Sequence, residues 1–428
     1  MKNTITFIDL FAGIGGIRCG VEQAAIKNGI DAQCVFTSEI KKHAVKVLEQ
    51  NYPTEKIHGD ITKILSSDIP DFDILCAGFP CQAFSSAGKR LGFLDTRGTL
   101  FFEIERILKA KRPRGFIIEN VEGLVNHDKG NTLKTIILSL ENIGYKVSYK
   151  VLNSKDFGVA QQRKRIYITG TFNDFVSLEN FESKNNVVIK DIIENGLPTI
   201  KTPFTTQLLS KYKISDLYGK SIKDKRGGDA NIHSWDLEIK GSLTQQQKEL
   251  LNLLLKERRK KKWAKEHGIE WMDGMPLTLS QIKSFYFNDK LDNMLNDMVE
   301  KGYLKYEFPK KIVRIETNNK ISSHRVYDTT KEKGYNIVTG KLSFEINKIL
   351  NPYDVAPTLV AMDMQKVCVA DNGGLRKLSL KEGLRLFGYP ETYKFKVSEK
   401  EGFDLLGNTV VVPVIEAIAN RLIKTINK

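Results

Sequence analysis

Short apolar runs alternate with amphipathic stretches from the start of the chain to about residue 171, and this alternation restricts the fold more than any other feature. The apolar runs have the length of β-strands, and the stretches between them carry apolar residues at helical spacing. Strands that alternate with helices of this length predict an α/β domain with a doubly wound, mostly parallel sheet. The expected strands are residues 4–11, 34–40, 71–78, 115–121, 145–154 and 165–170, and the expected helices are residues 16–29, 41–52, 100–113 and 134–144.

The character of the sequence changes after Thr171. Residues 172–395 are richer in lysine, asparagine and aspartate, and they lose the alternation of strands and helices. We interpret them as a second, smaller α+β domain. Residues 396–428 are apolar and helical again, so we expect a domain at 1–171, a domain at 172–395 and a C-terminal segment.

Composition and charge narrow the choice of partner and compartment. The 428 residues carry a formal net charge of +15, which suits a polyanion such as nucleic acid, although a lysine-rich composition gives the same total without one. Five cysteines, an odd number, indicate free thiols in a reducing compartment. No apolar run approaches the roughly 20 residues that cross a bilayer, and the N-terminus lacks a signal-peptide pattern, so we expect a cytoplasmic protein with no membrane contact.

A glycine-rich loop in FIDLFAGIGGIRCG joins the first expected strand to the first expected helix. Gly13, Gly15 and Gly16 let the backbone turn sharply and approach a ligand, and the N-terminus of the helix favours an anion there. A dinucleotide fingerprint needs a glycine where this chain has Arg18. The loop therefore suits an adenosyl ligand better than a pyrophosphate, and a tight turn without any ligand is the alternative.

Two acids come after the glycine loop at the ends of the following strands. Glu39 is spaced to accept hydrogen bonds from ribose hydroxyls, and Asp60, in HGDIT, could accept one from an adenine amino group. Either acid could instead cap a helix or lie in solvent. Because the three sites follow one another along one sheet edge, we predict that they bind the same adenosyl ligand.

The stretch CAGFPCQAFSSAGKR, residues 76–90, holds two of the five cysteines. The sequence offers no matching CxxC and no histidine pair at ligand spacing, so we expect no metal. Cys76 lies in an apolar strand, which predicts a buried structural thiol. Cys81, between Pro80 and Gln82 on a loop where such sheets bind ligands, is the better candidate for a nucleophile.

An acid and two arginines supply partners for that cysteine. Glu119 ends the apolar stretch GFIIENV, where desolvation raises the pKa of a carboxyl, although it could simply cap the next helix. Arg163 and Arg165, in QQRKR, share one face of an extended strand and could grip a carbonyl or form a solvated basic edge. Over an adenosyl-binding sheet these groups indicate methylation at C5 of a pyrimidine. A thiolate adds to C6, an acid supplies N3 with a proton, and arginines steady the charge at O2.

The chain resembles the bacterial DNA (cytosine-5)-methyltransferases, on the ordered blocks FIDLFAGIGG, PCQAFSSAG, ENVEGL, QQRKRIY, RKLSLKEGLRLFGYP and GNTVVVPVI. The resemblance implies a Rossmann-like methyltransferase fold in which the final helix returns to pack beside the first. It implies that Cys81 is the covalent nucleophile, that Glu119 faces the cytosine N3, and that Arg163 and Arg165 contact the flipped base or the region around the nucleophile. It also implies an S-adenosylmethionine site, with S-adenosylhomocysteine as product, lined by Phe11, Gly13, Gly15, Glu39, Asp60, Pro80 and Asn408.

The resemblance also implies a double-stranded DNA partner whose target base is flipped out of the helix. The loop after Cys81 would then touch DNA and close over the base, through Gln82, Ser85, Lys89 and Arg90, with Gly88 giving it freedom. We expect a monomer near the bacterial nucleoid, with a restriction endonuclease as an independently acting companion. A catalytically silent DNA-binding protein and an RNA cytosine-5 methyltransferase are the alternatives.

The middle domain is expected to read the DNA sequence. Thr358 and Leu359, in APTLVA, resemble the Thr-Leu signature of recognition domains, and Arg258, Arg259 and Lys262, in KERRKKKWAK, form either a phosphate-contacting helix or a solvated face. Two helix-like stretches followed by a strand-like pair predict a winged-helix unit at about 243–316. An ordinary helical insertion is the alternative, and a missing strand pair after Leu304 would contradict the hypothesis.

Overall fold

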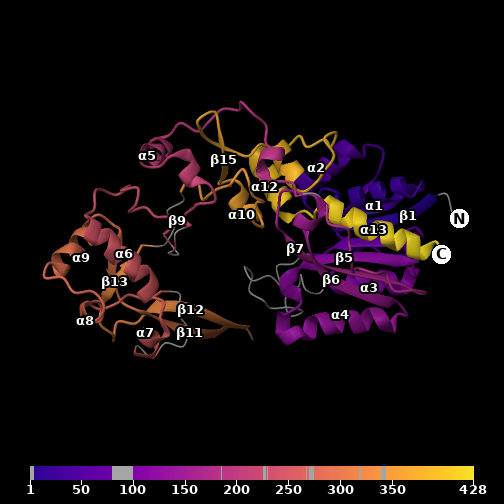
Figure 1. Cartoon of the computed structure of the whole chain (residues 1–428). Coiled ribbons are helices and arrows are strands. Elements are labelled where there is room, and N and C mark those ends of the chain that lie inside the picture. Colours follow the sequence, from indigo (N-terminus) through magenta and orange to yellow (C-terminus); the bar gives the residue numbers. More distant parts are fainter. Residues whose placement is uncertain are drawn as a thin grey trace. The chain divides into compact units, whose positions relative to one another are not determined.

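A computed structural model describes residues 4–428 except 80–99, 185, 225–227, 229, 267, 269–273, 318–319 and 339–343. The chain forms two compact units (Figure 1). Unit 1 contains Met1–Leu197, Asn351–Gln365 and Lys377–Lys428, and unit 2 contains Pro198–Leu350 and Lys366–Arg376. Stretches that we expected in the middle domain, including residues 172–197 and 351–365, therefore belong to unit 1.

Unit 1 is built on a seven-stranded sheet with the strand order β3-β2-β1-β4-β5-β7-β6. Neighbouring strands from β3 to β5 are parallel, whereas β7 runs antiparallel to both β5 and β6. This is the doubly wound, mostly parallel sheet that the alternating pattern predicts. The strands are β1 (Thr4–Leu10), β2 (Asp31–Ser38), β3 (Ile57–His58), β4 (Ile74–Gly78), β5 (Gly115–Val121), β6 (Lys146–Asn153) and β7 (Lys164–Thr171).

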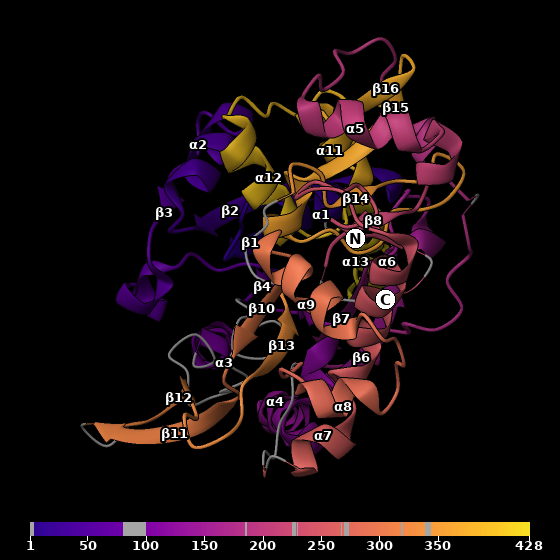
Figure 2. The ribbon, with the colours of Figure 1, turned by 90° about the vertical axis from the view of Figure 1, so that its left-hand side faces the viewer.

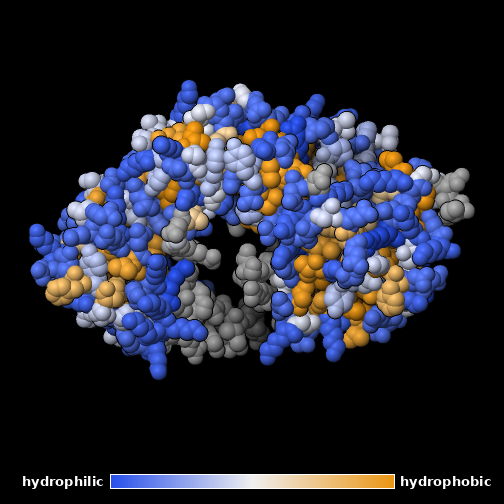
Figure 3. All heavy atoms as spheres, viewed as in Figure 1, coloured by the Kyte–Doolittle hydropathy of each residue, from blue (hydrophilic) through white to orange (hydrophobic). Residues whose placement is uncertain are grey.

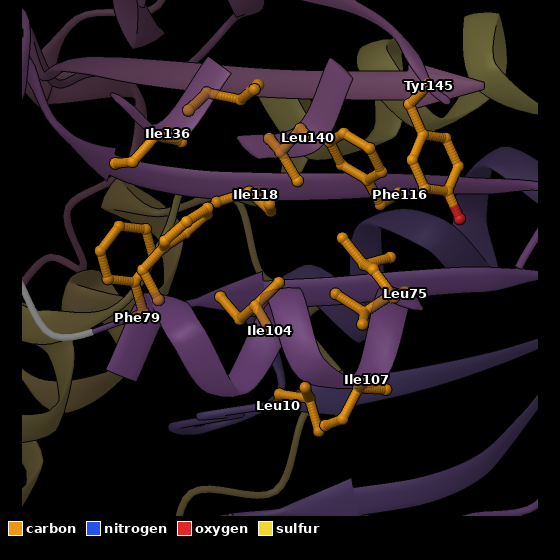
Figure 4. Packing of buried hydrophobic residues seen from close by; sticks show 14 of the residues in the cluster. Leu10, Leu75, Phe79, Ile104, Ile107, Phe116, Ile118, Ile136, Leu140 and Tyr145 are labelled. Atoms are coloured by element: carbon orange, nitrogen blue, oxygen red, sulfur yellow. The ribbon is translucent and has the colours of Figure 1, made fainter. Parts of the chain in front are cut away.

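Helices cover both faces of this sheet. On one face α3 (Leu100–Lys111) and α4 (Asn131–Asn142) bury Ile104 and Ile136 against strand residues such as Phe116 (Figure 4). On the other face lie α1 (Gly16–Lys27) and α13 (Val412–Ile426). A Cβ atom at Gly115 would meet Leu422 of α13, as expected for a position that alternates with Phe116 along β5. The other helices of unit 1 are α2 (Lys42–Asn51), α10 (Ala361–Met364), α11 (Leu380–Leu386) and α12 (Glu399–Asn408).

The first and last helices approach each other at Gly20. A Cβ atom at Gly20 would lie 2.6 Å from Ile415 of α13 and 2.9 Å from the backbone nitrogen of Glu416. Residues Glu399–Ile426 are long and apolar enough to cross a membrane, but 78% of the most apolar window is buried in the fold, which is typical of core helices. The face of the molecule in Figure 3 is mostly hydrophilic.

Unit 2 has two hydrophobic clusters. One lies around the five-stranded sheet β16-β15-β14-β8-β9, next to α5 (Pro203–Lys211). Those strands are β8 (Ser221–Ile222), β9 (Asn231–Ile232), β14 (Lys348–Ile349), β15 (Val367–Asp371) and β16 (Gly374–Lys377). The other cluster joins helices and short strands between residues 235 and 337. Its elements are α6 (Gln245–Glu257), α7 (Lys261–Glu266), α8 (Leu279–Lys283), α9 (Leu291–Glu300), β10 (Leu304–Glu307) and β13 (Gly334–Ile337). Between β10 and β13 the chain forms the β11 (Lys310–Thr317) and β12 (Lys320–Tyr327) hairpin, whose described side chains lie outside the cluster.

We predict that Gly20→Val destabilises the protein by about 1–3 kcal/mol, because the new side chain would force α1 and α13 apart. Urea denaturation followed by circular dichroism would measure the change. The control is Gly59→Ala, at a position where a Cβ atom meets no described atom within 4 Å. Equal stability of Gly20→Val and the parent protein would show that the two helices do not pack as described.

Candidate active site

One edge of the unit 1 sheet gathers most of the predicted site residues that the structure describes. The parallel strands β1, β2, β4 and β5 end at this edge, and the antiparallel β7 begins there. The glycine loop therefore lies beside the ends of β2 and β4, and Arg165 of β7 pairs with Val121 at the end of β5. This topology brings residues from distant parts of the sequence together.

The glycine loop has the backbone that its sequence predicts. Phe11, Gly13 and Gly15 all have positive φ angles, of 56°, 56° and 71°, and a positive φ at a residue with a side chain marks a constrained position that is common at functional sites. The Ala12 nitrogen donates to the Ser38 carbonyl over 3.1 Å, which ties the loop to the end of β2. A Cβ atom at Gly13 would meet no described atom within 4 Å, so the loop borders open space on that side.

Glu39 lies against this loop. Its Oε2 accepts from the Gly13 nitrogen at 2.7 Å, and its Oε1 accepts from the nitrogens of Ile40 and Lys41 at 2.9 and 2.7 Å. Ile40, the residue after Glu39, carries an apolar side chain that is 73% exposed.

Asp60 lies at the next strand end and caps a short helix. Its Oδ1 accepts from the Thr62 nitrogen at 3.1 Å and from the Thr62 hydroxyl at 2.8 Å. These hydrogen bonds lower the pKa of Asp60. The Glu39 nitrogen donates to the carbonyl of His58, so the two acids are on neighbouring strand ends. The capping alternative thus describes Asp60 in this structure, at the edge where the adenosyl ligand was expected.

Glu119 is buried at the end of β5 and is paired with Arg165. The Arg165 Nε lies 3.2 Å from the Glu119 Oε1. Burial raises the pKa of Glu119, while the positive charges of Arg165 and Arg163 oppose that rise. The following 3₁₀ helix, Glu122–Leu124, begins after Val121, so Glu119 is not its cap. The Glu119 carboxyl group lies close to the end of β4, because its Oε2 would be 3.7 Å from a Cβ atom built on Gly78.

Asn120 holds the chain that leads out of β4. Its Nδ2 donates to the Phe79 carbonyl over 3.1 Å, in a buried hydrogen bond. Phe79 is the last described residue before Pro80 and Cys81. Sequence reasoning missed this role, although Asn120 directly follows the predicted acid.

Arg163 is buried and binds backbone carbonyls of distant segments. It is 4% exposed, and its guanidinium donates to the carbonyls of Leu359, Gly407 and Thr409 at 3.1, 3.2 and 3.0 Å. These bonds give Arg163 a role in holding backbone segments together, while its expected contact with the flipped base or the region around the nucleophile stays a prediction, because residues 80–99 lie outside the described part of the chain. Only Arg165 pairs directly with Glu119.

The Thr-Leu signature lies in unit 1 beside the same arginine. Leu359 is 3% exposed, and its nitrogen donates to the Gln161 Oε1 over 3.3 Å. The Thr358 hydroxyl donates to the Gln162 carbonyl over 2.8 Å. Our placement of APTLVA inside the middle domain is corrected by this contact with QQRKR, and burial removes Leu359 from the candidate DNA contacts in this conformation.

Asn408 is exposed at the end of α12, where its Nδ2 donates to the Asp404 carbonyl over 2.8 Å. The next residue, Thr409, is hydrogen-bonded to Tyr389 over 2.6 Å. A Cβ atom at Gly16 would lie 3.0 Å from the Thr409 Oγ1. The C-terminal motif thus reaches the glycine loop.

Several predicted site residues lie outside the described part of the chain. They are Pro80, Cys81, Gln82, Ser85, Gly88, Lys89 and Arg90. Cys76 is fully buried in β4, as expected for a structural thiol. Among the described residues, no group of three or more His, Cys, Asp or Glu side chains could hold a metal ion.

The basic run in unit 2 is not one helix, because α6 ends at Glu257 and α7 begins at Lys261. Arg258 is 3% exposed, and its guanidinium bonds to Asn336 and to the Ile337 carbonyl. Arg258 is therefore in no position to contact a phosphate in this conformation. Arg259 is half-buried, whereas Lys262 is exposed, with its Nζ 3.8 Å from the centre of the Trp263 ring.

We predict that Arg163→Met destabilises the protein by about 2–4 kcal/mol, because it leaves buried carbonyls without their donor. Lys164→Met changes the exposed neighbour and should shift stability by less than about 0.5 kcal/mol. Urea denaturation of both variants would test the contrast. Similar small effects would mean that Arg163 does not tie these segments together.

Comparison with known proteins identifies a family that matches almost the whole chain. A family model described as C-5 cytosine-specific DNA methylase matches residues 5–424. The chain is 60% identical to the Type II methyltransferase M.NlaIV of Neisseria lactamica over 99% of both chains, and 40% identical to M.HgiCI of Herpetosiphon aurantiacus over 98% of both. The fold resembles the solved structure of the S. pombe Dnmt2 methyltransferase, at 16% identity and a TM-score of 0.52 over 99% of this chain and 100% of the other.

The structural match agrees with the mostly parallel sheet of unit 1. Dependence on S-adenosylmethionine follows from the family and the fold. The chain belongs to the C-5 cytosine-specific DNA methylase family and is a Type II DNA (cytosine-5)-methyltransferase.

Proposed function

We propose that this enzyme transfers the methyl group of S-adenosylmethionine to C5 of a cytosine flipped out of duplex DNA, through a covalent bond between Cys81 and C6. One observation carries the proposal: a buried carboxyl, Glu119, is paired with Arg165 and directed toward Gly78, at the end of the strand that leads into the Cys81 loop. A carboxyl group at this edge can give a proton to the cytosine N3, and a guanidinium beside it can stabilise negative charge at O2.

The glycine loop fits the cofactor. No described atom lies within 4 Å of a Cβ atom at Gly13, which leaves room for an adenosyl group. Phe11 has a positive φ, as is common at functional sites, and the exposed apolar side chain of Ile40 could pack against the adenine ring. Glu39 would accept hydrogen bonds from the ribose hydroxyls in place of some of its present bonds from backbone nitrogens. Asp60 would accept a hydrogen bond from the adenine amino group. Gly15, Pro80 and Asn408 would complete the site. When bound, S-adenosylmethionine supplies an electrophilic methyl group.

The residues around the base would carry the chemistry. The Cys81 thiolate forms a bond to C6, and Glu119 donates a proton or hydrogen bond to N3, so electron density moves to C5 and lets that carbon take the methyl group. Arg165 would steady the charge at O2 while holding Glu119 in place. Loss of the C5 proton to a base, return of the N3 proton to Glu119 and release of the C6–sulfur bond then give 5-methylcytosine and free Cys81, with S-adenosylhomocysteine as the second product. Arg163 contributes by positioning the segments around it.

Unit 2 is proposed to read the DNA sequence, and Gln82, Ser85, Lys89 and Arg90 to contact DNA next to the flipped base. Thr358 and Lys262, both exposed, and the half-buried Arg259 remain candidate DNA contacts. Because relatives are Type II methyltransferases, we propose that the enzyme is the modification partner of a restriction endonuclease that acts independently. A cytoplasmic monomer near the nucleoid agrees with these roles. The pairing of Glu119 with Arg165 favours an active enzyme over a silent DNA-binding protein.

We predict that Glu119→Gln lowers the rate of methyl transfer by about 10²- to 10⁴-fold, because the amide cannot deliver a proton to N3. Transfer of labelled methyl from S-adenosylmethionine to duplex DNA would be measured under single-turnover conditions. Glu122→Gln is the matched control, since Glu122 is exposed three residues away. A parental rate in Glu119→Gln would remove Glu119 from the mechanism, and transfer to RNA alone would favour the RNA alternative.

The pH dependence of the rate should report the same carboxyl group. Burial raises the pKa of Glu119 above its usual value of 4.5. In the proposed mechanism the carboxyl with its proton is the active form. The single-turnover rate should therefore fall as pH rises through this raised pKa. Glu119→Gln has no proton to lose there, so its slower rate should lack that fall. A fall of the same size in both proteins would assign the titration to another group.

A further inference from the structure

Residues 243–337 of unit 2 have the order of elements of a winged helix. Helix α6 is followed by the short additional helix α7, by a single bridging residue, Leu277, then by α8 and α9, then by β10, the β11–β12 hairpin and β13. A helix, a short strand, two helices and a strand–wing–strand ending are the parts of this helix-turn-helix relative. The strand pair after Leu304 that the hypothesis requires is present.

The strand pairing has the matching topology. β13 runs antiparallel to β10, with Leu304 opposite Ile337. On its other side, Tyr335 of β13 exchanges backbone hydrogen bonds with Leu277, at 2.8 and 3.0 Å. The strand between the first two helices thus pairs with the strand after the wing, and one small sheet closes the unit.

One hydrophobic core joins these parts. It includes Leu250 and Leu254 of α6, Ile282 of α8 and Leu295 of α9, together with Leu277 and Leu304. Arg258, at the end of α6, bonds to Asn336 and Ile337 of β13, and its carbonyl accepts from the Met275 nitrogen over 3.1 Å. Arg258, which the sequence left as either a phosphate contact or part of a solvated face, instead links the first helix to the sheet.

Charge divides the two elements that a winged helix can present to DNA. Helix α9, at the position of the recognition helix, has the sequence LDNMLNDMVE, with three acids and no lysine or arginine. Its exposed residues include Asp292, Asn293, Asn296 and Glu300. The β11 and β12 strands, KKIVRIET and KISSHRVY, contain five lysines and arginines and one acid. Two of the α9 acids are paired with lysines outside the helix, Asp292 with Lys283 at 3.7 Å and Asp297 with Lys301 at 2.7 Å. Helix α9 therefore offers a phosphate backbone no cation of its own, whereas the hairpin attracts it.

The hairpin also has the shape for such a contact. It extends from β10 and β13 of the same unit (Figure 2). In its register Lys310 lies opposite Tyr327 and Ile312 opposite Arg325, so these four residues share one face of the ribbon. All four are exposed, with Ile312 47% and Tyr327 50% exposed. Two cations beside apolar and aromatic surface suit a groove edge, where phosphates and sugars lie together.

We infer that this enzyme contains a winged-helix unit that binds duplex DNA through its β11–β12 wing, by Lys310 and Arg325, and not through α9. The inference rests on the proposed role of unit 2 in binding the DNA substrate. It gives the enzyme a DNA contact separate from the catalytic edge, one that adds affinity without reading bases through a recognition helix.

The test is binding of the full-length enzyme to fluorescein-labelled, mixed-sequence duplex DNA over a series of KCl concentrations. For the double variant Lys310→Ala/Arg325→Ala we expect binding at least about tenfold weaker near physiological salt, and a slope of log Kd against log salt that is smaller by about two. The charge-reversed variant Lys310→Glu/Arg325→Glu should weaken binding further. Thermal midpoints close to that of the parent would show that each variant is folded.

Two matched variants complete the test. Asn293→Ala/Asn296→Ala alters the exposed face of α9 and should bind as the parent does. Lys424→Ala removes an exposed lysine near the end of α13, where Leu422 and Ile426 pack beside Gly115 at the opposite edge of the unit 1 sheet, and should also leave binding unchanged.

The possible outcomes separate the claims. Parental affinity and salt slope in the wing variants overturn the inference and make the wing a solvated basic ribbon. A larger loss in the α9 variant than in the wing variants overturns it in favour of ordinary recognition-helix binding. If the parent enzyme itself neither binds nor methylates any duplex, the proposed function fails, which is distinguishable because the first two outcomes leave parental methylation intact.

Discussion

The buried guanidinium of Arg163 joins stretches of unit 1 that are 196 to 246 residues apart in the sequence. Unit 2 is inserted between them, so the chain leaves unit 1 and must return to it with correct geometry. The buried Arg163 donates hydrogen bonds to three backbone carbonyls of the returning chain, and these bonds fix where that chain packs in unit 1. Thr409, held in this way, lies over the start of α1 and borders the glycine loop. Arg163 therefore holds in place both the segment that borders the glycine loop and the segment that leads into β7 next to Glu119.

Much of this arrangement could be predicted from the sequence. The alternation of strands and helices was enough for the sheet, because period and length of apolar runs reflect local geometry. Glu119 and Glu39 could be placed because residues that follow parallel strands meet at one edge. Arg163 shows the limit, since it and Arg165 have the same spacing signal. The two arginines differ because Arg163 donates to carbonyls of residues far along the chain, whereas Arg165 pairs with Glu119. Such distant partners cannot be identified from the local sequence.

Unit 2 was harder to predict for a related reason. Arg258 belongs to a run of basic residues that looks like a solvated or phosphate-binding face, yet its guanidinium is buried against Asn336. A residue 78 positions away decides its role. The wing was predicted only in part: a strand pair follows Leu304, but the predicted unit ends at 316, whereas β12 extends to Tyr327 and β10 pairs with β13 rather than with β11. The difference in charge between α9 and the wing then makes the wing the better candidate for a DNA contact.

The central claim is that Cys81 forms a covalent bond to the cytosine ring while Glu119 and Arg165 hold it. The most direct measurement is trapping of the enzyme on duplex DNA that contains 5-fluorocytosine, in the presence of S-adenosylmethionine. Fluorine at C5 cannot leave as a proton does, so the C6–sulfur bond should persist and give a protein–DNA adduct that survives denaturing electrophoresis. The account predicts this adduct in the parent enzyme and its loss in Cys81→Ser. An equal adduct in Cys81→Ser, or transfer of the methyl group without any adduct in the parent, would contradict it.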